Sequence, residues 1–160
     1  MDERVARFVE RMGLYTEAEG LPRIAGRIFG FLLVQPAACS LDDLASALGV
    51  SKASISTDTR RLEQLGLLER TSRPGDRRDY YIISQHVLPR SLDVRLERMR
   101  RFQELLDEAR SLPLRSPTVR DRLDNLVAAH TDMIDAVAEL QQRWKATSEA
   151  ELARQARQAG

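Results

Sequence analysis

The sequence predicts a mainly helical protein (α+β), in which one small β-hairpin interrupts a series of helices. Three observations predict this fold. Apolar residues recur at steps of three and four along most of the chain, which is the period of amphipathic helices. Two short stretches, 67–71 and 80–84, have the composition of strands. Between them, Pro74, Gly75 and Asp76 form a sequence typical of tight turns, so the two stretches are predicted to pair as a hairpin.

Two helices are predicted at the start of the chain. Residues 2–16 place four apolar residues on one helical face, namely Val5, Phe8, Met12 and Tyr15. Gly20 interrupts this helix, and Pro22 is predicted to be the first residue of the second one, because the N–H that proline lacks is not needed there. Gly26 and Gly30 lie four residues apart in the second helix. Their spacing predicts close packing against a neighbouring helix.

Two shorter helices with a tight turn between them are predicted next. Ser40 caps the first helix, and Asp43 occupies the capping-box position three residues later. Gly49 supplies the turn, and Ser51 caps the second helix. That helix ends at Gly66, since glycine readily adopts the left-handed conformation of a helix terminus. A helix, a turn and a helix followed by a hairpin is the layout of a winged helix-turn-helix domain.

Two long helices are predicted after the hairpin. Pro89 begins the first of them, which ends near Leu112. Ser116 caps the second helix and Pro117 takes its first position. Seven apolar residues and one histidine in this last helix alternate steps of four and three: Val119, Leu123, Leu126, His130, Met133, Val137, Leu140 and Trp144. A repeat of 3.5 residues keeps one narrow seam toward a partner helix, as in coiled coils.

The second helix of the helix-turn-helix carries a candidate DNA-binding face. Ile55 and Leu62 are one heptad apart and are predicted to point into the core, which leaves short polar and cationic side chains on the other side. A helix with such a face fits the major groove of DNA, which is about 12 Å wide. Arginines of the hairpin can bind phosphates or a narrow minor groove, and Asp76 or Asp79 could hold one of them extended. The candidate DNA-binding residues are Ser51, Lys52, Ser54, Ser56, Thr57, Arg60, Arg73, Arg77 and Arg78.

Five stretches of the sequence carry a resemblance to a known family. They are residues 20–28, 41–45, 48–56, 65–68 and 74–81. Through them, the chain between residues 20 and 84 resembles the GbsR-like branch of the MarR-type winged helix-turn-helix transcriptional regulators. The resemblance implies a homodimer built from N- and C-terminal helices, a winged helix on each protomer and often a small-molecule effector. It assigns Lys52, Ser56, Thr57 and Arg60 to the DNA groove, and Arg77 and Arg78 to the wing tip.

The sequence departs from this family at Asp58 and Thr59, where such regulators usually have apolar residues. Thr59 lies four residues after Ile55 and is predicted on the buried side of the helix, with its hydroxyl bonded to a carbonyl of the preceding turn. Asp58 is expected to face a flank of the helix or an arginine such as Arg61 or Arg27. Because of this departure, the sequence does not determine how the second helix of the helix-turn-helix, the recognition helix, is rotated about its axis.

The predicted elements divide the chain into three regions. These are an N-terminal dimerisation helix (1–19), the winged helix-turn-helix domain (20–84) and a C-terminal helical dimerisation region (85–160). The apolar seams of the long helices exceed what a small winged domain can cover. Pairing across a homodimer would bury them, and the alternative is packing within one protomer. The predicted dimer core comprises Val5, Phe8, Leu123, Leu126, Met133, Val137 and Leu140.

Composition limits the functional classes. The formal net charge is only +1, so DNA binding has to rest on the clustering of basic residues and not on their excess. Cys39 is the only cysteine, and no segment suits a membrane span or a signal peptide, so a cytoplasmic location is expected. The only two histidines, His86 and His130, are far apart in the sequence, and no phosphate-binding loop or nucleophile motif occurs. We therefore predict no metal site, no cofactor and no enzyme.

An alternative function stays open on the sequence alone. A winged helix can dock a protein partner, gripping it with the hairpin and the helical arms, and such a module would not bind DNA. Cys39 is predicted to be a small apolar filler before a helix and not a redox sensor. A small-molecule inducer is expected from the family resemblance.

Overall fold

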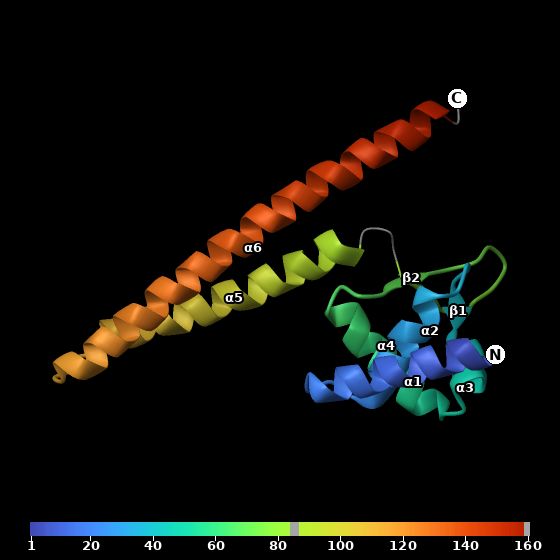
Figure 1. The fold of residues 1–160 in the computed structure, drawn as a ribbon, viewed down its shortest axis with the longest axis horizontal. Helices are drawn as coiled ribbons and strands as arrows, with labels where there is room; N and C mark the ends of the chain where they lie inside the picture. The colour runs from blue at the N-terminus through green and yellow to red at the C-terminus, as the bar shows by residue number, and fades with distance from the viewer. Residues whose placement is uncertain (84–86, 159–160) are drawn as a thin grey trace. The chain divides into compact units, whose positions relative to one another are not determined.

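The structure is a computed structural model that describes residues 1–83 and 87–158. It divides into two compact units, Met1–Val87 and Leu88–Gly160 (Figure 1). The predictions for Ser84 and His86 fall outside the described residues. In the part of the chain that the structure describes, no helix has the length and apolar character needed to cross a membrane.

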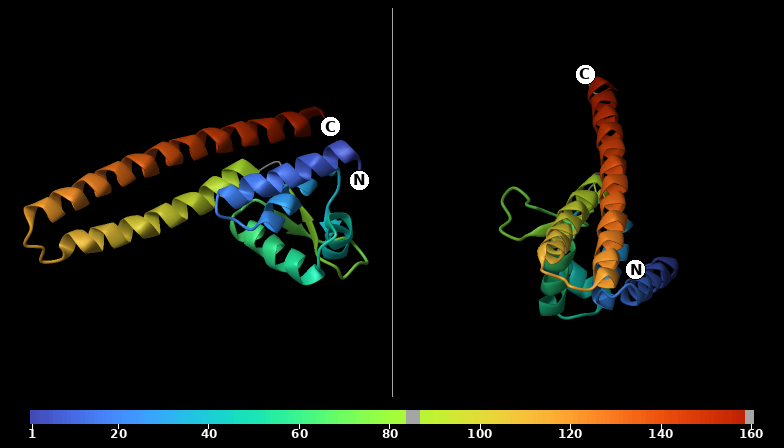
Figure 2. Two further views of the ribbon diagram at one scale, coloured as in Figure 1. Left: turned by 60° about the horizontal axis from the view of Figure 1, so that its bottom comes forward. Right: turned by 90° about the vertical axis from the view of Figure 1, so that its left-hand side faces the viewer.

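The N-terminal unit contains four helices and three short strands within its described residues. In chain order they are α1 (Glu3–Ala18), α2 (Arg23–Leu33), β1 (Cys39–Ser40), α3 (Leu41–Leu48), α4 (Lys52–Gln64), β2 (Glu69–Thr71) and β3 (Tyr80–Ile82). The C-terminal unit is built from α5 (Val87–Ser111) and α6 (Pro117–Gln158), which run antiparallel beside each other (Figure 2). The predicted mainly helical fold with a small sheet is confirmed. Pro22 caps α2 and is not its first residue, a difference of one position.

The three strands form an antiparallel sheet in the order β1, β3, β2. Tyr80 of β3 pairs with Ser40 of β1 on one side and with Thr71 of β2 on the other. β2 and β3 form the predicted hairpin. Both strands are shorter than the predicted ranges of 67–71 and 80–84. The sequence does not predict β1, since two residues are too few to show an alternating pattern. The sheet joins the wing to the chain that leads into α3.

Side chains from all four helices meet in one hydrophobic core in the N-terminal unit. Ile55 and Leu62, the residues of α4 predicted to point inward, are 0% and 1% exposed. Leu68 and Tyr81 close the core from the sheet side. Burying an isoleucine or leucine side chain contributes about 1.5–3 kcal/mol, so these contacts fix the rotation of α4.

α1 packs closely on α2 at two glycines, and part of its predicted apolar face takes part in this contact. Gly26 and Gly30 of α2 are buried, and a Cβ added at Gly26 would collide with the backbone of α1. This approach puts Val9 in the core, whereas Phe8 and Tyr15 are 37% and 64% exposed. Close packing at the two glycines is confirmed. Val5 and Met12 of the predicted apolar face are half-buried toward this contact, whereas Phe8 and Tyr15 of the same face lie outside it.

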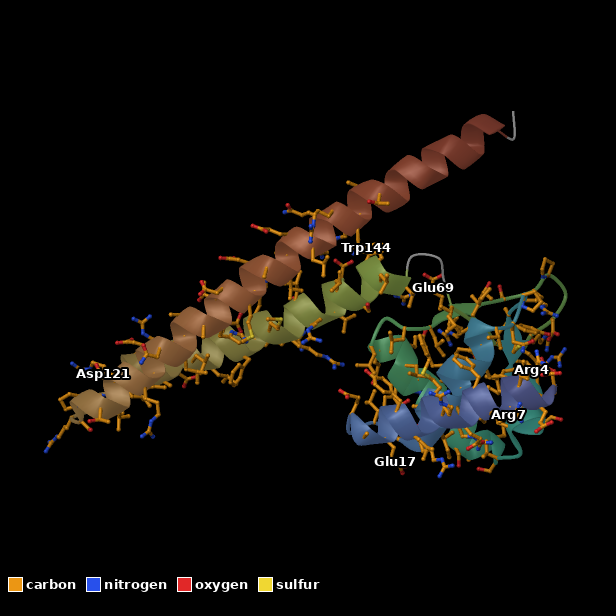
Figure 3. All side chains as sticks on the ribbon, in the orientation of Figure 1. Arg4, Arg7, Glu17, Glu69, Asp121 and Trp144 are labelled. Atoms are coloured by element: carbon orange, nitrogen blue, oxygen red, sulfur yellow. The ribbon has the colours of Figure 1, made fainter. Side chains whose placement is uncertain are left out.

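The helices of the C-terminal unit bury one face against each other. Leu96 and Leu106 of α5 and Val127 of α6 are buried. His130 is also buried, and its Nδ1 lies 2.8 Å from Oε1 of Gln103, so this polar residue of the seam is hydrogen-bonded between the two helices. Other large apolar side chains of this unit are exposed, among them Phe102, Leu105, Leu112, Leu126, Met133 and Trp144. Trp144 is labelled on α6 in Figure 3. The seam of α6 is therefore only partly covered by α5.

Candidate nucleic-acid interface

α4 has the polar outward face that the sequence predicts. The candidate contact residues on or before this helix are all exposed or half-buried: Ser51, Lys52, Ser54, Ser56, Thr57 and Arg60. The Ser51 hydroxyl accepts a hydrogen bond from the backbone N–H of Ser54 at 3.2 Å, which caps the helix. Arg60 forms no hydrogen bond or ion pair within the described residues. Its guanidinium is therefore available to a ligand.

The start of α3 is held by the predicted capping box. The backbone N–H of Asp43 donates to Oγ of Ser40 at 3.2 Å, and the backbone N–H of Ser40 donates to Oδ2 of Asp43 at 2.9 Å. The hydrogen bonds from Ser40 hold the pKa of Asp43 below its ordinary value. The neighbouring Asp42 lies 2.8 Å from Nζ of Lys52. This exposed ion pair links α3 to the first residue of α4.

The turn between α3 and α4 is fixed by a glycine and by an arginine. Gly49 ends α3 in the left-handed conformation, with φ of 64°. Arg27 of α2 donates from Nη2 to the carbonyl oxygen of Leu48 at 2.8 Å, and its Nε lies 2.7 Å from Glu10 of α1. Sequence reasoning considered Arg27 only as a partner for Asp58 and missed this role. The signal that could have revealed this role is the position of Arg27, a charged residue within the largely apolar helix α2.

Asp58 and Thr59 both turn inward, although both are polar. Thr59 is fully buried, and its hydroxyl donates to the carbonyl oxygen of Ile55 at 2.8 Å, as predicted. Asp58 is 6% exposed, and its carboxylate lies 3.4 Å from the guanidinium of Arg61. Burial raises the pKa of Asp58, and the nearby Arg61 offsets this in part. The departure from the family pattern is accommodated inside the unit and leaves the outward face of α4 intact.

Replacing Asp58 with asparagine is expected to stabilise the protein by about 1 kcal/mol at neutral pH, because a buried charge is replaced by a neutral group of similar shape. Since the pKa of Asp58 is raised in the folded protein, the wild type becomes more stable as pH falls through that pKa, and the advantage of the variant shrinks in acid. Thermal unfolding at neutral pH and near pH 4 measures both effects.

The matched control for this prediction is Asp132→Asn, which removes the same charge from an exposed position on α6. It should leave the unfolding temperature unchanged. An Asp58→Asn variant that is less stable than the wild type at neutral pH would contradict this explanation of the buried carboxylate.

In the wing, an aspartate holds an arginine in place. The sequence predicts this role for either Asp76 or Asp79. Nη2 of Arg78 lies 2.6 Å from Oδ2 of Asp76. Hydrogen bonds from Arg78 and from Tyr80 hold the pKa of Asp76 far below its usual range, so its carboxylate is charged at neutral pH. Asp79 lies 3.4 Å from Arg70 at the base of the hairpin. Asp76 is therefore the residue that orients a wing arginine.

The three predicted wing arginines differ in their surroundings. Arg73 donates from Nη2 to the carbonyl oxygen of Ala38 at 2.7 Å, so it also ties the hairpin to the chain before β1. Arg78 is held by its aspartate and is still 54% exposed. Arg77 is exposed and forms no hydrogen bond or ion pair within the described part of the chain. Of the three wing arginines, Arg73 is bonded to the chain before β1, Arg78 is held by Asp76, and Arg77 has no partner within the described residues.

Cys39 is half-buried in β1. Burial raises the pKa of its thiol, and Arg73 only partly counters that effect, so little reactive thiolate forms at neutral pH. This fits the predicted filler role. In the residues that the structure describes, no three histidine, cysteine, aspartate or glutamate side chains gather in a way that could hold a metal ion.

A capped helix-turn-helix with an outward polar face, followed by an arginine-bearing hairpin, defines a winged helix-turn-helix protein. Residues 19–79 match the sequence profile of the MarR family. The chain is 37% identical over 145 residues to the HTH-type transcriptional regulator MmpR5 of Mycobacterium tuberculosis, an alignment that covers 87% of this chain and 88% of that protein. The chain therefore belongs to the MarR family and is a transcriptional regulator of that family.

A solved structure supports the same assignment. It is described as a transcriptional regulator and matches this chain with a TM-score of 0.82 and 35% sequence identity. The match covers 89% of this chain and 98% of that one, so it extends well beyond the winged domain. Both relatives are named as regulators and not as enzymes.

Proposed function

We propose that the protein is a homodimer that binds specific sequences of double-stranded DNA through α4 and the wing. The main support for this proposal is the exposed polar face of α4, which is followed in the chain by a hairpin with Arg73, Arg77 and Arg78. The motifs between residues 20 and 84 support its placement in the GbsR-like branch of the family. The protein acts in the cytoplasm, by binding and not by catalysis.

Each part of the site has a role in this proposal. α4 enters the major groove, where its outward side chains bind base edges and phosphates. Its N-terminus, with Ser51 and Ser54, binds a backbone phosphate, because the free N–H groups and the helix dipole favour an anion there. Arg77 and Arg78 bind the adjacent minor groove or its phosphates, and Arg73 lies at the base of the wing.

Selection from sheared genomic DNA tests sequence-specific binding. Purified protein is incubated with the fragments, the bound ones are sequenced, and the Kd for the recovered site is compared with that for a scrambled duplex. We expect the recovered site to bind at least about 1,000-fold more tightly, the lower end of the range for specific over non-specific binding. Equal affinity for the two duplexes would contradict the proposal.

Exposed apolar surface supports the homodimer. Leu126 and Met133 are 44% and 51% exposed and lie one heptad apart on the same face of α6, and contiguous apolar surface of this kind is uncommon on monomeric proteins. The predicted dimer-core residues of α6 are all exposed or half-buried: Leu123, Leu126, Met133, Val137 and Leu140. On α1, Phe8 is exposed and Val5 is half-buried. A two-fold dimer would bury these residues and present two recognition helices to half-sites roughly 34–36 Å apart.

Replacing Met133 with glutamate is expected to separate the dimer into monomers, because a charge would be buried without a partner in the dimer core. Analytical ultracentrifugation at micromolar concentration should give a dimer for the wild type and a monomer for the variant. Ala128→Glu is the control, since Ala128 is exposed about 140° around α6 from Met133 and should leave the dimer intact. A wild type that sediments as a monomer would refute the dimer.

We further propose that a small-molecule effector changes the DNA affinity. Such a molecule would favour a dimer in which the two recognition helices no longer match the half-site spacing, and so would shift the population away from DNA. Screening small molecules for release of the protein from its recovered site tests this regulation. A compound that binds the protein but leaves the Kd for DNA unchanged is not an effector.

A further inference from the structure

Tyr80 lies at the centre of the contacts that hold the wing. It belongs to the middle strand of the sheet, where it pairs with Ser40 and with Thr71, and it is only 1% exposed. Its hydroxyl donates to Oδ2 of Asp76 at 2.7 Å and accepts a hydrogen bond from Nη2 of Arg78 at 2.9 Å. One buried side chain therefore touches both members of the wing's ion pair.

The ion pair itself has a well-defined geometry. Nε of Arg78 lies 3.1 Å and 3.0 Å from the two carboxylate oxygens of Asp76, and the backbone N–H of Arg78 also donates to Oδ1 at 2.9 Å. These bonds use Nε and Nη2 of the guanidinium. Nη1 has no partner within the described residues and stays available to DNA. The direction in which Arg78 offers that group depends on Asp76, and Asp76 in turn is held by Tyr80.

The ring of Tyr80 anchors the other arm of the hairpin. The guanidinium carbon of Arg73 lies 4.1 Å from the ring centroid, a cation–π contact. The same guanidinium donates to the carbonyl oxygen of Ala38, at the entry to β1. Both arms of the wing thus contact Tyr80: Arg73 contacts its ring, and Arg78 contacts its hydroxyl and also lies 5.5 Å from its ring centroid.

We propose that Tyr80 is a positioning residue for DNA binding, which sets the direction in which the wing presents Arg78. This inference rests on the proposed function, because it gives the wing a DNA-binding role. Tyr80 acts through Asp76 and Arg78, since its own side chain is buried and neutral and does not reach a phosphate.

Tyr80→Phe tests the proposal, because it removes the hydroxyl and keeps the ring that contacts Arg73. We expect the affinity for the recovered DNA site to fall roughly three- to tenfold for each bound protomer, the effect of one hydrogen bond, and so roughly ten- to 100-fold for the proposed dimer. The affinity for a scrambled duplex and the salt dependence should change much less, because Arg78 keeps its charge and its place on the wing. A variant with wild-type specificity, or one that loses both affinities together with its unfolding temperature, would overturn the proposal. Tyr15→Phe, at an exposed position on α1, is the control.

A double-mutant cycle with Arg78→Ala separates this pathway from an independent effect. If the hydroxyl of Tyr80 acts by positioning Arg78, adding Tyr80→Phe to Arg78→Ala costs no further specific affinity. Additive losses would overturn the proposal.

An NMR signal provides a readout that does not need DNA. The Nε–H of Arg78, bonded to Asp76, should exchange slowly in the wild type and faster in Tyr80→Phe. A wild type that keeps this protected signal but binds no duplex would refute the proposed function. A Tyr80→Phe variant that keeps the signal and the specific affinity would refute the role of Tyr80 alone.

Discussion

Gly26→Ala is expected to destabilise the N-terminal unit by about 3 kcal/mol or more, the upper part of the range for overpacked sites. The added Cβ would lie 1.8 Å from Oγ1 of Thr16 and 2.6 Å from the backbone oxygen of Met12. Thr16 could change its rotamer, but the backbone of α1 can escape only by moving away from α2. Thermal unfolding followed by circular dichroism measures the loss.

Gly30→Ala is the matched control for this change. Its Cβ would meet Cβ and Cγ of Met12 at 2.9 Å and 3.0 Å, so α1 has to shift by only a few tenths of an ångström, a smaller movement than Gly26→Ala demands. Alanine is also favoured over glycine in a helix by about 1 kcal/mol, which offsets part of the strain. We therefore expect a much smaller loss than at Gly26. Equal stability of Gly26→Ala and the wild type would contradict the close contact of α1 and α2.

Replacing both Arg60 and Arg77 with alanine is expected to weaken DNA binding about 100-fold for each bound protomer, and so about 10,000-fold for the proposed dimer, since each loss of a charge-assisted hydrogen bond costs about tenfold. Both side chains are exposed and make no hydrogen bond or ion pair within the described residues, so the fold should be unaffected. If both bind phosphates, the slope of log K against log salt should become shallower by about 1.8 per protomer. Fluorescence anisotropy with a labelled duplex measures both quantities.

The control for the double variant removes two arginines elsewhere. Arg11 on α1 and Arg115 between α5 and α6 are exposed and likewise make no such contact among the described residues. Replacing both with alanine changes the net charge equally, and we expect the affinity to stay within about threefold of the wild type. A loss as large as that of the Arg60 and Arg77 pair would mean that overall charge, and not the proposed site, determines binding.

The features that the sequence predicts correctly depend on neighbours in the chain. The cap at Ser40, the turn at Gly49 and the cap at Ser51 each follow from a side chain or a backbone preference within a few residues. The inward bond of Thr59 to Ile55 is equally local. Local chemistry therefore suffices to define the recognition helix and its outward face.

The features that sequence reasoning misses join segments far apart in the chain. Arg73 contacts Ala38, which lies 35 residues before it. Arg27 contacts Leu48 across 21 residues, and no periodic pattern marks such pairs. The burial of Val9 is missed for a related reason, because the position of the contact of α1 depends on Gly26 of another helix. The bond from the hairpin to the chain before β1 and the bond from α2 to the turn after α3 could be found only from the fold.

The most direct test of the claim that α4 and the wing bind DNA is the salt dependence of wild-type binding to the recovered site. For six phosphates neutralised by a dimer, log K should fall linearly with log salt concentration with a slope of about −5. A slope near zero, or no binding to any duplex at about 50 mM salt, would contradict the account and favour a module that docks a protein partner.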